Sequence, residues 1–246
     1  MSLAKRIIPV ILHKHGQLVK GRCFKSDRVI GNALQAALIH AGREVDELLL
    51  IDVTATLEGR EPDYELTQRL AEKCFSPLTV GGGICKDEHI RGLLNAGADK
   101  VLLGTAAGDM EFIQTASEKY GSSTIAVAVD VRKNTVVLRS GRLDTIFDPV
   151  EYACAMEHIG AGEIVLTSID RDGTMKGYDL PLIKAVSNAV GIPVIAAGGC
   201  GSYQHMLEAI TNGADGVAAG AAWIFRDMTP RGAATYLRSN NVEVRL

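Results

Sequence analysis

The sequence lacks the features that would place it in a membrane, on nucleic acid or in an oxidising compartment. No apolar run in its 246 residues approaches the roughly 20 residues that a membrane-spanning helix needs. The formal net charge is only −3, so there is no basic excess to attract nucleic acid or an acidic membrane surface. The five cysteines form no C-x-x-C spacing and are odd in number, which predicts a reduced, cytoplasmic protein.

Common catalytic and metal-binding signatures are also missing. The chain has no G-x-S-x-G elbow and no nucleophilic Cys–His signature. His13 and His15 form an H-x-H pair, which strand alternation could direct to one side as zinc ligands. No third ligand follows them, so a solvated loop is the favoured interpretation. We expect neither a metal nor a cofactor.

One glycine-rich stretch occurs twice, about half a chain length apart. Residues 79–105 read TVGGGICKDEHIRGLLNAGADKVLLGT, and residues 194–221 read VIAAGGCGSYQHMLEAITNGADGVAAGA. Gly82 matches Gly198 and Gly97 matches Gly213, because 198 − 82 and 213 − 97 both equal 116. The repeat predicts a single quasi-symmetric domain over residues 1–246 with two similar halves, about 1–120 and 121–246.

Glycines in these positions indicate phosphate binding. A residue without Cβ lets the backbone approach a ligand closely and adopt positive φ, and free N–H groups beside a helix N-terminus attract anions. The alternative is that these glycines only serve tight turns in a crowded fold. Because the pattern occurs twice, each time with a second small-residue strand end downstream, we predict two phosphate sites on opposite sides of one pocket. Their members are Gly82, Gly83, Thr105, Gly198, Gly199, Gly220 and Ala221.

Eight apolar runs of strand length alternate with segments of helical spacing, with no linker between them. The runs are residues 6–12, 47–53, 77–80, 100–103, 124–129, 163–167, 193–197 and 216–219. This α/β pattern predicts a (β/α)8 TIM barrel. A doubly wound sheet is the alternative, but it does not require a twofold repeat. Residues 13–31 predict a long functional or mobile loop, and residues 134–144 predict a small β-excursion.

The C-terminal ends of barrel strands form the active-site rim. Asp130 ends an apolar strand, where partial burial would raise its pKa and suit general acid or base catalysis. Capping of the next segment explains the same position equally well. The stretch SIDRDGT adds Asp170 and Asp172 to the same rim.

Several motifs together resemble the cyclase subunit of imidazole glycerol phosphate synthase. They are RII, VKG, DELLLIDVTAT, TVGGGI, GADKVLLGTAA, GEIVLTSIDRDGT and GADG, and they extend over essentially the whole chain. The resemblance implies a (β/α)8 barrel in a heterodimer with a glutaminase subunit. Ammonia from the glutaminase would pass through the barrel interior to the top face. There it would react with a bisphosphorylated aminoimidazole carboxamide ribonucleotide in histidine biosynthesis.

The resemblance also implies roles for individual residues. It makes Asp130 the catalytic acid, places Lys20, Thr167 and Asp172 around the substrate, and puts the two phosphates on the glycine elements. Asp99 matches a position that contacts the glutaminase. The family's charged ring at the ammonia entrance is matched as well, with salt-bridge stabilisation as the alternative explanation. Its members here are Arg6, Glu47, Lys100 and Glu163.

One position departs from the family pattern. The family ends its first strand in a second catalytic carboxylate, in a pattern like LDVKDG, whereas residues 11–16 here read ILHKHG and put Leu12 in that place. Leucine cannot transfer a proton, and losing such a group typically lowers a rate by about 10²–10⁴-fold. His13 or His15 would substitute only if the loop turned inward. Gly104 also stands where the family usually has an asparagine.

Three functions therefore remain open. The first is a cyclase with a weakened acid–base pair. The second is an ammonia-conducting barrel that, with its glutaminase, serves a third protein, a sugar amidotransferase of surface-polysaccharide (O-antigen type) biosynthesis. Loss of the carboxylate at Leu12 with retention of the charged ring favours this second function. The third is a stand-alone sugar-phosphate isomerase barrel, ranked last because it too needs a carboxylate at that position.

Overall fold

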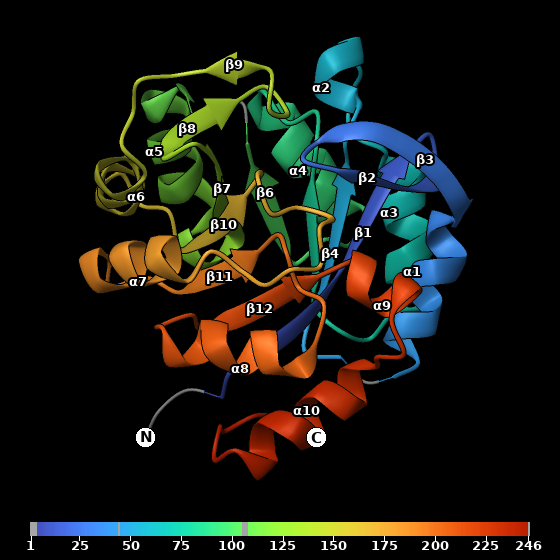
Figure 1. The fold of residues 1–246 in the computed structure, drawn as a ribbon. Helices are drawn as coiled ribbons and strands as arrows, with labels where there is room; N and C mark the ends of the chain where they lie inside the picture. The colour runs from blue at the N-terminus through green and yellow to red at the C-terminus, as the bar shows by residue number, and fades with distance from the viewer. Residues whose placement is uncertain (1–3, 44, 105–107, 246) are drawn as a thin grey trace.

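The structure is a computed structural model that describes residues 4–43, 45–104 and 108–245 (Figure 1). Within these residues, eight parallel strands pair side by side, and the pairing of the last with the first closes a barrel. In order they are β1 (Arg6–Lys14), β4 (Leu48–Asp52), β5 (Leu78–Gly81), β6 (Lys100–Leu103), β7 (Ile125–Arg132), β10 (Glu163–Ser168), β11 (Val194–Ala197) and β12 (Gly216–Ala219). The predicted (β/α)8 barrel is confirmed.

The strands are apolar runs because both of their faces are buried. Alternate side chains point outward to the helices and inward to the barrel axis. The inward layer is a separate apolar cluster, formed by Ile8, Leu49, Leu102, Ala126, Val165, Ile195 and Ala218. The outward side chains form the larger core between the strands and the helices.

Helices surround the barrel (Figure 1). They are α1 (Ala33–Ala41), α3 (Tyr64–Ala71), α4 (Asp87–Asn95), α5 (Met110–Tyr120), α6 (Pro149–His158), α7 (Leu180–Ala189), α8 (Tyr203–Thr211) and α10 (Pro230–Ser239), with short α2 (Ala55–Glu58), α9 (Ala221–Phe225) and the 3-10 turn η2 (Ser122–Thr124). The sequence pattern did not predict α10, although Thr229 caps it and Pro230 occupies its first turn. Among the described residues, no helix has the length and apolarity to cross a bilayer.

Two β-excursions rise from the top of the barrel, one in each half (Figure 1). After β1 come β2 (Gln17–Arg22) and β3 (Lys25–Asn32), and after β7 come β8 (Thr135–Leu138) and β9 (Leu143–Asp144). The second excursion confirms the prediction over residues 134–144. The prediction of a loop over residues 13–31 is wrong, because these residues form paired antiparallel strands. His15 and Gly16 adopt a left-handed turn between β1 and β2, and Cys23 and Phe24 adopt one between β2 and β3.

The two excursions start in the same register. His13 pairs with Leu18 in the first, and Val131 pairs with Val136 in the second. Since 131 − 13 and 136 − 18 both equal 118, this register makes Leu12 the structural equivalent of Asp130. The twofold repeat that the glycine motifs predict is therefore also present in the strand pairing.

Each glycine turn packs its backbone against the end of the preceding strand. A Cβ on Gly82 would lie 2.2 Å from the Asp52 carbonyl oxygen, and one on Gly198 would lie 2.6 Å from that of Ser168. Both glycines have positive φ, +102° and +83°. The close approach and the left-handed backbone both require glycine.

The Gly82→Ala substitution is expected to lower the free energy of unfolding by about 3 kcal/mol or more, because it adds a clash with backbone to an unfavourable φ. Chemical denaturation measures this loss. Gly59→Ala is the matched control, since Gly59 has φ +64° but no atom within 4 Å of an added Cβ. Its expected cost is about 1–2 kcal/mol, from the backbone conformation alone. Equal losses in the two variants would show that the close approach to Asp52 is unimportant.

Candidate functional site

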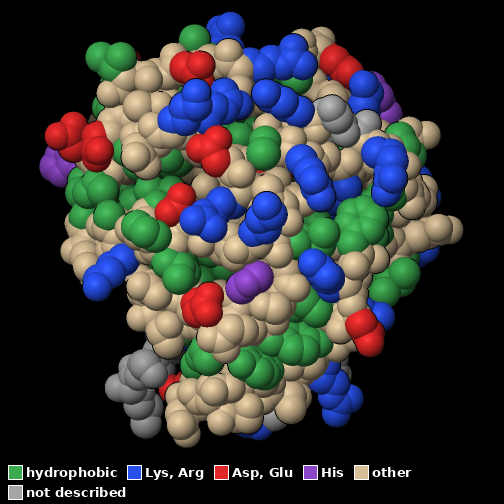
Figure 2. All heavy atoms as spheres, in the orientation of Figure 1, with side chains coloured by type: hydrophobic (Ala, Val, Ile, Leu, Met, Phe, Trp, Pro, Cys, Tyr) green, Lys and Arg blue, Asp and Glu red, His purple; other side chains and the backbone are tan. Residues whose placement is uncertain are grey.

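A single pocket at the C-terminal ends of the strands brings both glycine elements together. Of the predicted substrate and phosphate residues, those that line it are Lys20, Gly82, Gly83, Asp130, Thr167, Asp172, Gly198, Gly199, Gly220 and Ala221. Thr105 lies outside the described residues. Figure 2 shows Lys and Arg side chains gathered on the upper part of the molecule, where Figure 1 places the two excursions. The mouth of the pocket is therefore on a basic face.

Asp130 projects from β7 into the pocket, and its carboxyl group has a raised pKa. Its side chain faces the pocket but is surrounded by protein, and this burial raises its pKa to about 7. A hydrogen bond from Thr167 opposes the shift, and the nearby Asp172 carboxylate adds to it. A carboxyl group that titrates near neutral pH suits general acid catalysis.

Lys20 lies over Gly220, the small-residue strand end of the second half. Its Nζ donates a hydrogen bond to the Val10 carbonyl at 3.3 Å. A Cβ on Gly220 would lie 2.2 Å from the same Nζ, so the ammonium fills the space that the glycine leaves. Burial lowers the pKa of Lys20 to about 8, against the opposing effect of Asp172. A buried ammonium beside bare backbone is an arrangement that attracts a phosphate.

Leu12 lines the pocket at the position equivalent to Asp130. The neighbouring histidines do not line the pocket: His13 is buried with its Nδ1 unpartnered, and burial lowers its pKa. His15 instead lies 3.2 Å from Glu58. Neither ring is placed to replace a carboxylate at Leu12.

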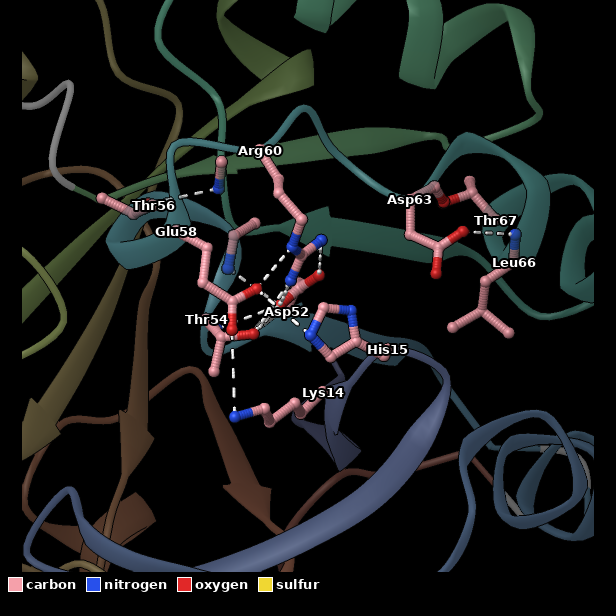
Figure 3. A network of polar contacts seen from close by, with 12 residues as sticks. Lys14, His15, Asp52, Thr54, Thr56, Glu58, Arg60, Asp63, Leu66 and Thr67 are labelled. Atoms are coloured by element: carbon pink, nitrogen blue, oxygen red, sulfur yellow. Dashed lines mark hydrogen bonds and ion pairs between the residues drawn. The ribbon is translucent and has the colours of Figure 1, made fainter.

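Asp52 is a second carboxylate on the pocket wall, but it is fully engaged (Figure 3). It accepts hydrogen bonds from the backbone N–H groups of Thr54 and Ala55 at 2.9 and 3.0 Å. The Arg60 guanidinium donates to both of its oxygens, at 3.2 and 3.3 Å, and to Glu58 at 2.6 Å. Burial alone would raise the pKa of Asp52, but the Thr54 amide and Arg60 hold it below its usual value. Asp52 is thus an ionised group that fixes the loop after β4.

The tip of the first hairpin is anchored on the loop after β10. The backbone N–H of Cys23 donates to the Asp172 carbonyl at 3.0 Å. A Cβ on Gly173 would lie 2.2 Å from the Gly21 carbonyl oxygen, so the two backbones are in close contact. The hairpin therefore covers one side of the pocket, and it carries Lys20 into it.

The four predicted ring residues meet at the opposite end of the barrel. Arg6 forms ion pairs with Glu47, at 2.7 Å, and with Glu163. Lys100 bridges the same two carboxylates, at 3.2 and 3.3 Å. The carboxylates are only 4% and 7% exposed, and Thr79 donates a further hydrogen bond to Glu47 at 2.6 Å. The result is a closed, alternating ring of charge across the bottom of the barrel.

Asp99 has a structural role that the sequence did not reveal. Its Oδ2 accepts the backbone N–H of Leu78 at 2.8 Å, which ties the start of β5 to the start of β6. Asp215, 116 residues later, makes the same contact with Val194 at 3.2 Å. Asp99 is exposed at the bottom of the barrel, and its contact with a glutaminase stays a prediction.

Some pocket residues were not found from the sequence. Arg139 and Arg142 line the pocket from the turn between β8 and β9. Two arginines around Ser-Gly in a predicted excursion were the available signal, whereas no local pattern marks Arg60 as the partner of Asp52. In the part of the chain that the structure describes, no group of three His, Cys, Asp or Glu side chains is placed to hold a metal ion.

Comparison with known families adds an independent finding. A family model described as "Histidine biosynthesis protein" matches residues 6–229. The match includes all eight barrel strands, both glycine turns and the four ring residues. This family includes isomerase-type and cyclase-type barrels of histidine biosynthesis.

Proposed function

The chain belongs to the histidine biosynthesis protein family, and on this premise we propose that it is a cyclase-type subunit. It takes ammonia from a glutaminase partner and binds a bisphosphorylated aminoimidazole carboxamide ribonucleotide between its glycine turns. The observation that carries the proposal is the presence, on one barrel axis, of a closed charged ring at the bottom and the pocket around Asp130 at the top.

The ring supports ammonia transfer more than stability. Buried ion pairs recover little more than the cost of removing the charges from water, so apolar residues would seal the barrel as well. Charged groups that close an entrance, by contrast, can be rearranged when a partner binds. The inward cluster above the ring is uncharged and contains Ala126 and Ala218. Such an interior suits neutral ammonia, because ammonium would lose its hydration there.

The pocket supports binding of a ligand with two phosphates. One phosphate fits the turn at Gly198 and Gly199 with Lys20 at Gly220, and the other fits the turn at Gly82 and Gly83. Asp130 lies between them and is about half protonated near neutral pH. Ammonia adds to a carbonyl carbon of the ligand, the C=O π electrons move to the oxygen, and Asp130 donates its proton to that oxygen. The absence of a carboxylate at Leu12 leaves this acid without a facing base.

A second candidate function follows from Leu12 itself. A barrel that only conducts ammonia to a sugar amidotransferase needs the ring and the partner, but it needs no proton-transfer pair. Turnover of the bisphosphorylated ribonucleotide with ammonium chloride and purified protein separates the two functions. Product formation supports the cyclase, and its absence, with glutamine-dependent transfer to a third protein, supports the conducting barrel. Rescue of a histidine auxotroph, by the gene together with its glutaminase, tests the same point in cells.

The Lys100→Met substitution is expected to uncouple the two ammonia sources. It leaves two buried carboxylates with Arg6 alone, so the free energy of unfolding should fall by about 3 kcal/mol. Glutamine-dependent turnover should fall, while turnover with ammonium chloride is kept, because the top pocket is unchanged. Lys119→Met, which removes an exposed lysine paired with Asp87, is the control. Equal loss of both activities would argue against the ring as an ammonia entrance.

A further inference from the structure

Each excursion follows one barrel strand and lies against the end of the strand that pairs with it. The first hairpin follows β1 and places Lys20 against Gly220, at the end of β12. The second follows β7, which pairs with β6, and its Leu138 lies 3.3 Å from the Cβ position of Gly108, shortly after β6. By this symmetry the second excursion belongs to the phosphate turn of the first half.

At each of two pairs of equivalent positions, only one half of the barrel carries an ionisable side chain. The common register, with its offset of 118 residues, makes Lys20 equivalent to Leu138, as it makes Leu12 equivalent to Asp130. One half therefore supplies the ammonium and the other supplies the acid. The second excursion has a hydrocarbon where the first carries its cation, so the phosphate turn at Gly82 and Gly83 needs a cation from elsewhere.

The arginine turn, residues 139–142, carries two cations at the same pocket. The charged residues among the described pocket lining are Lys20, Asp52, Asp130, Arg139, Arg142 and Asp172. In the described part of the chain, neither arginine has a side-chain hydrogen bond or an ion pair. The nearby Arg132, by contrast, is used internally, with Asp144 at 3.0 Å and the Gly141 carbonyl at 2.8 Å.

The arginine turn is also held in place. Arg139, Ser140 and Gly141 all have positive φ, at 53°, 53° and 81°. Such a backbone is unfavourable for the first two residues, so surrounding contacts must maintain it. Arg132 holds the Gly141 carbonyl, and Phe24 of the first hairpin packs where a Cβ on Gly141 would lie, at 2.8 Å. The backbone of the turn is thus held at the pocket, and its two exposed guanidinium groups have no partner among the described residues.

We propose that the arginine turn binds the phosphate that rests on the Gly82–Gly83 side of the pocket, as the counterpart of Lys20 at Gly220. This inference rests on the proposed two-phosphate ligand. Guanidinium groups form paired, charge-assisted hydrogen bonds with phosphate oxygens, which an apolar or neutral ligand end does not offer. The turn therefore selects ligands with a phosphate at each end over those with one.

A calorimetric titration of the protein with inorganic phosphate tests the proposal. The wild-type protein is expected to bind two phosphates. The Arg139→Gln, Arg142→Gln double variant should bind one, with the other weakened about 10- to 100-fold, as expected when hydrogen bonds between charged groups are lost. Lys20→Gln should remove the other site instead. The control is Lys133→Gln, which removes an exposed cation of the same excursion that does not line the pocket.

Each outcome of this titration is decisive. The proposal is overturned if the folded double variant keeps both phosphates, or if Lys133→Gln weakens binding equally, which would indicate only diffuse attraction. If the wild-type protein binds no phosphate, both the role of the arginine turn and the proposed two-phosphate ligand are contradicted. If the phosphates behave as expected but no turnover with ammonium chloride is found, the arginine turn stands and the cyclase assignment fails. Circular dichroism and thermal midpoints establish that the variants are folded.

Discussion

Asp130→Asn is expected to lower turnover with ammonium chloride by about 10²–10⁴-fold, the usual contribution of a general acid. The amide keeps the shape of the side chain and its contact with Thr167, but its N–H protons are not acidic enough to be transferred to a ligand. Steady-state kinetics of the purified barrel measure the effect. The KM for the ribonucleotide should change little, because the glycine turns and Lys20 bind the phosphates.

The pH dependence gives a second measurement of the same group. Since burial raises the pKa of Asp130 from 3.8 to about 7, the protonated acid is lost as pH rises through 7, and kcat should fall there. Stability changes in the same window. The folded protein holds this proton more tightly than the unfolded chain, so the stabilising contribution is complete below about pH 4 and is lost as pH rises through 7. Above pH 7, Asp130→Asn should therefore be more stable than the wild type.

An Asp130→Asn variant that keeps wild-type turnover would contradict the cyclase proposal. Asp227→Asn is the matched control, because Asp227 is an exposed carboxylate of the same half that does not line the pocket. It should leave both kcat and its pH profile unchanged.

Leu12→Asp is expected to raise turnover with ammonium chloride by about 10²–10⁴-fold, because it restores a proton acceptor opposite Asp130. The wall position already faces the pocket, so the new carboxylate needs no rearrangement to reach it. It should also raise the pKa of Asp130 further, since the two carboxylates then repel each other across the pocket. Single-turnover kinetics and the shift of the kcat–pH profile measure both effects.

The Leu12→Asn variant separates the effect of the carboxylate on turnover from the effect of the change in side-chain size and polarity. It places a polar side chain of the same shape in the same position but cannot accept a proton, so it should not raise turnover. If the two variants behave alike, the missing carboxylate is not what limits the wild-type protein. If neither shows turnover, the conducting barrel becomes the better function, since repairing the acid–base pair would then bring no chemistry.

Much of the fold could be predicted because barrel strands are buried on both faces and leave uninterrupted apolar runs. The runs over residues 100–103 and 216–219 coincide with β6 and β12, and the others differ from their strands by one to three residues at an end. The hairpin over residues 17–32 was missed because its strands are polar and pair over the barrel mouth. Its tip contacts Asp172 and Gly173, which are about 150 residues away in the chain.

The site was only partly predictable for a related reason. The family resemblance assigned Asp99 to a contact with the glutaminase, and it gave no sign that the carboxylate ties two strands together. Asp52 stands at a strand end as Asp130 does, and sequence position alone cannot tell them apart. Asp52 is held ionised by Arg60 in its own loop, whereas Asp130 has a neighbouring carboxylate and little solvent. The difference in their chemistry depends on neighbours in space.

The sequence by itself determined the barrel, its internal repeat, the position of the two glycine turns and the loss of a carboxylate at Leu12. These follow from local rules: apolar runs form buried strands, glycine permits close backbone approach, and leucine carries no proton. Only the tertiary structure decided that Arg6, Glu47, Lys100 and Glu163 close one ring, that Lys20 lies against Gly220 and that the arginine turn lines the pocket. Charge and proton affinity depend on distances between groups far apart in the chain, and folding alone sets those distances.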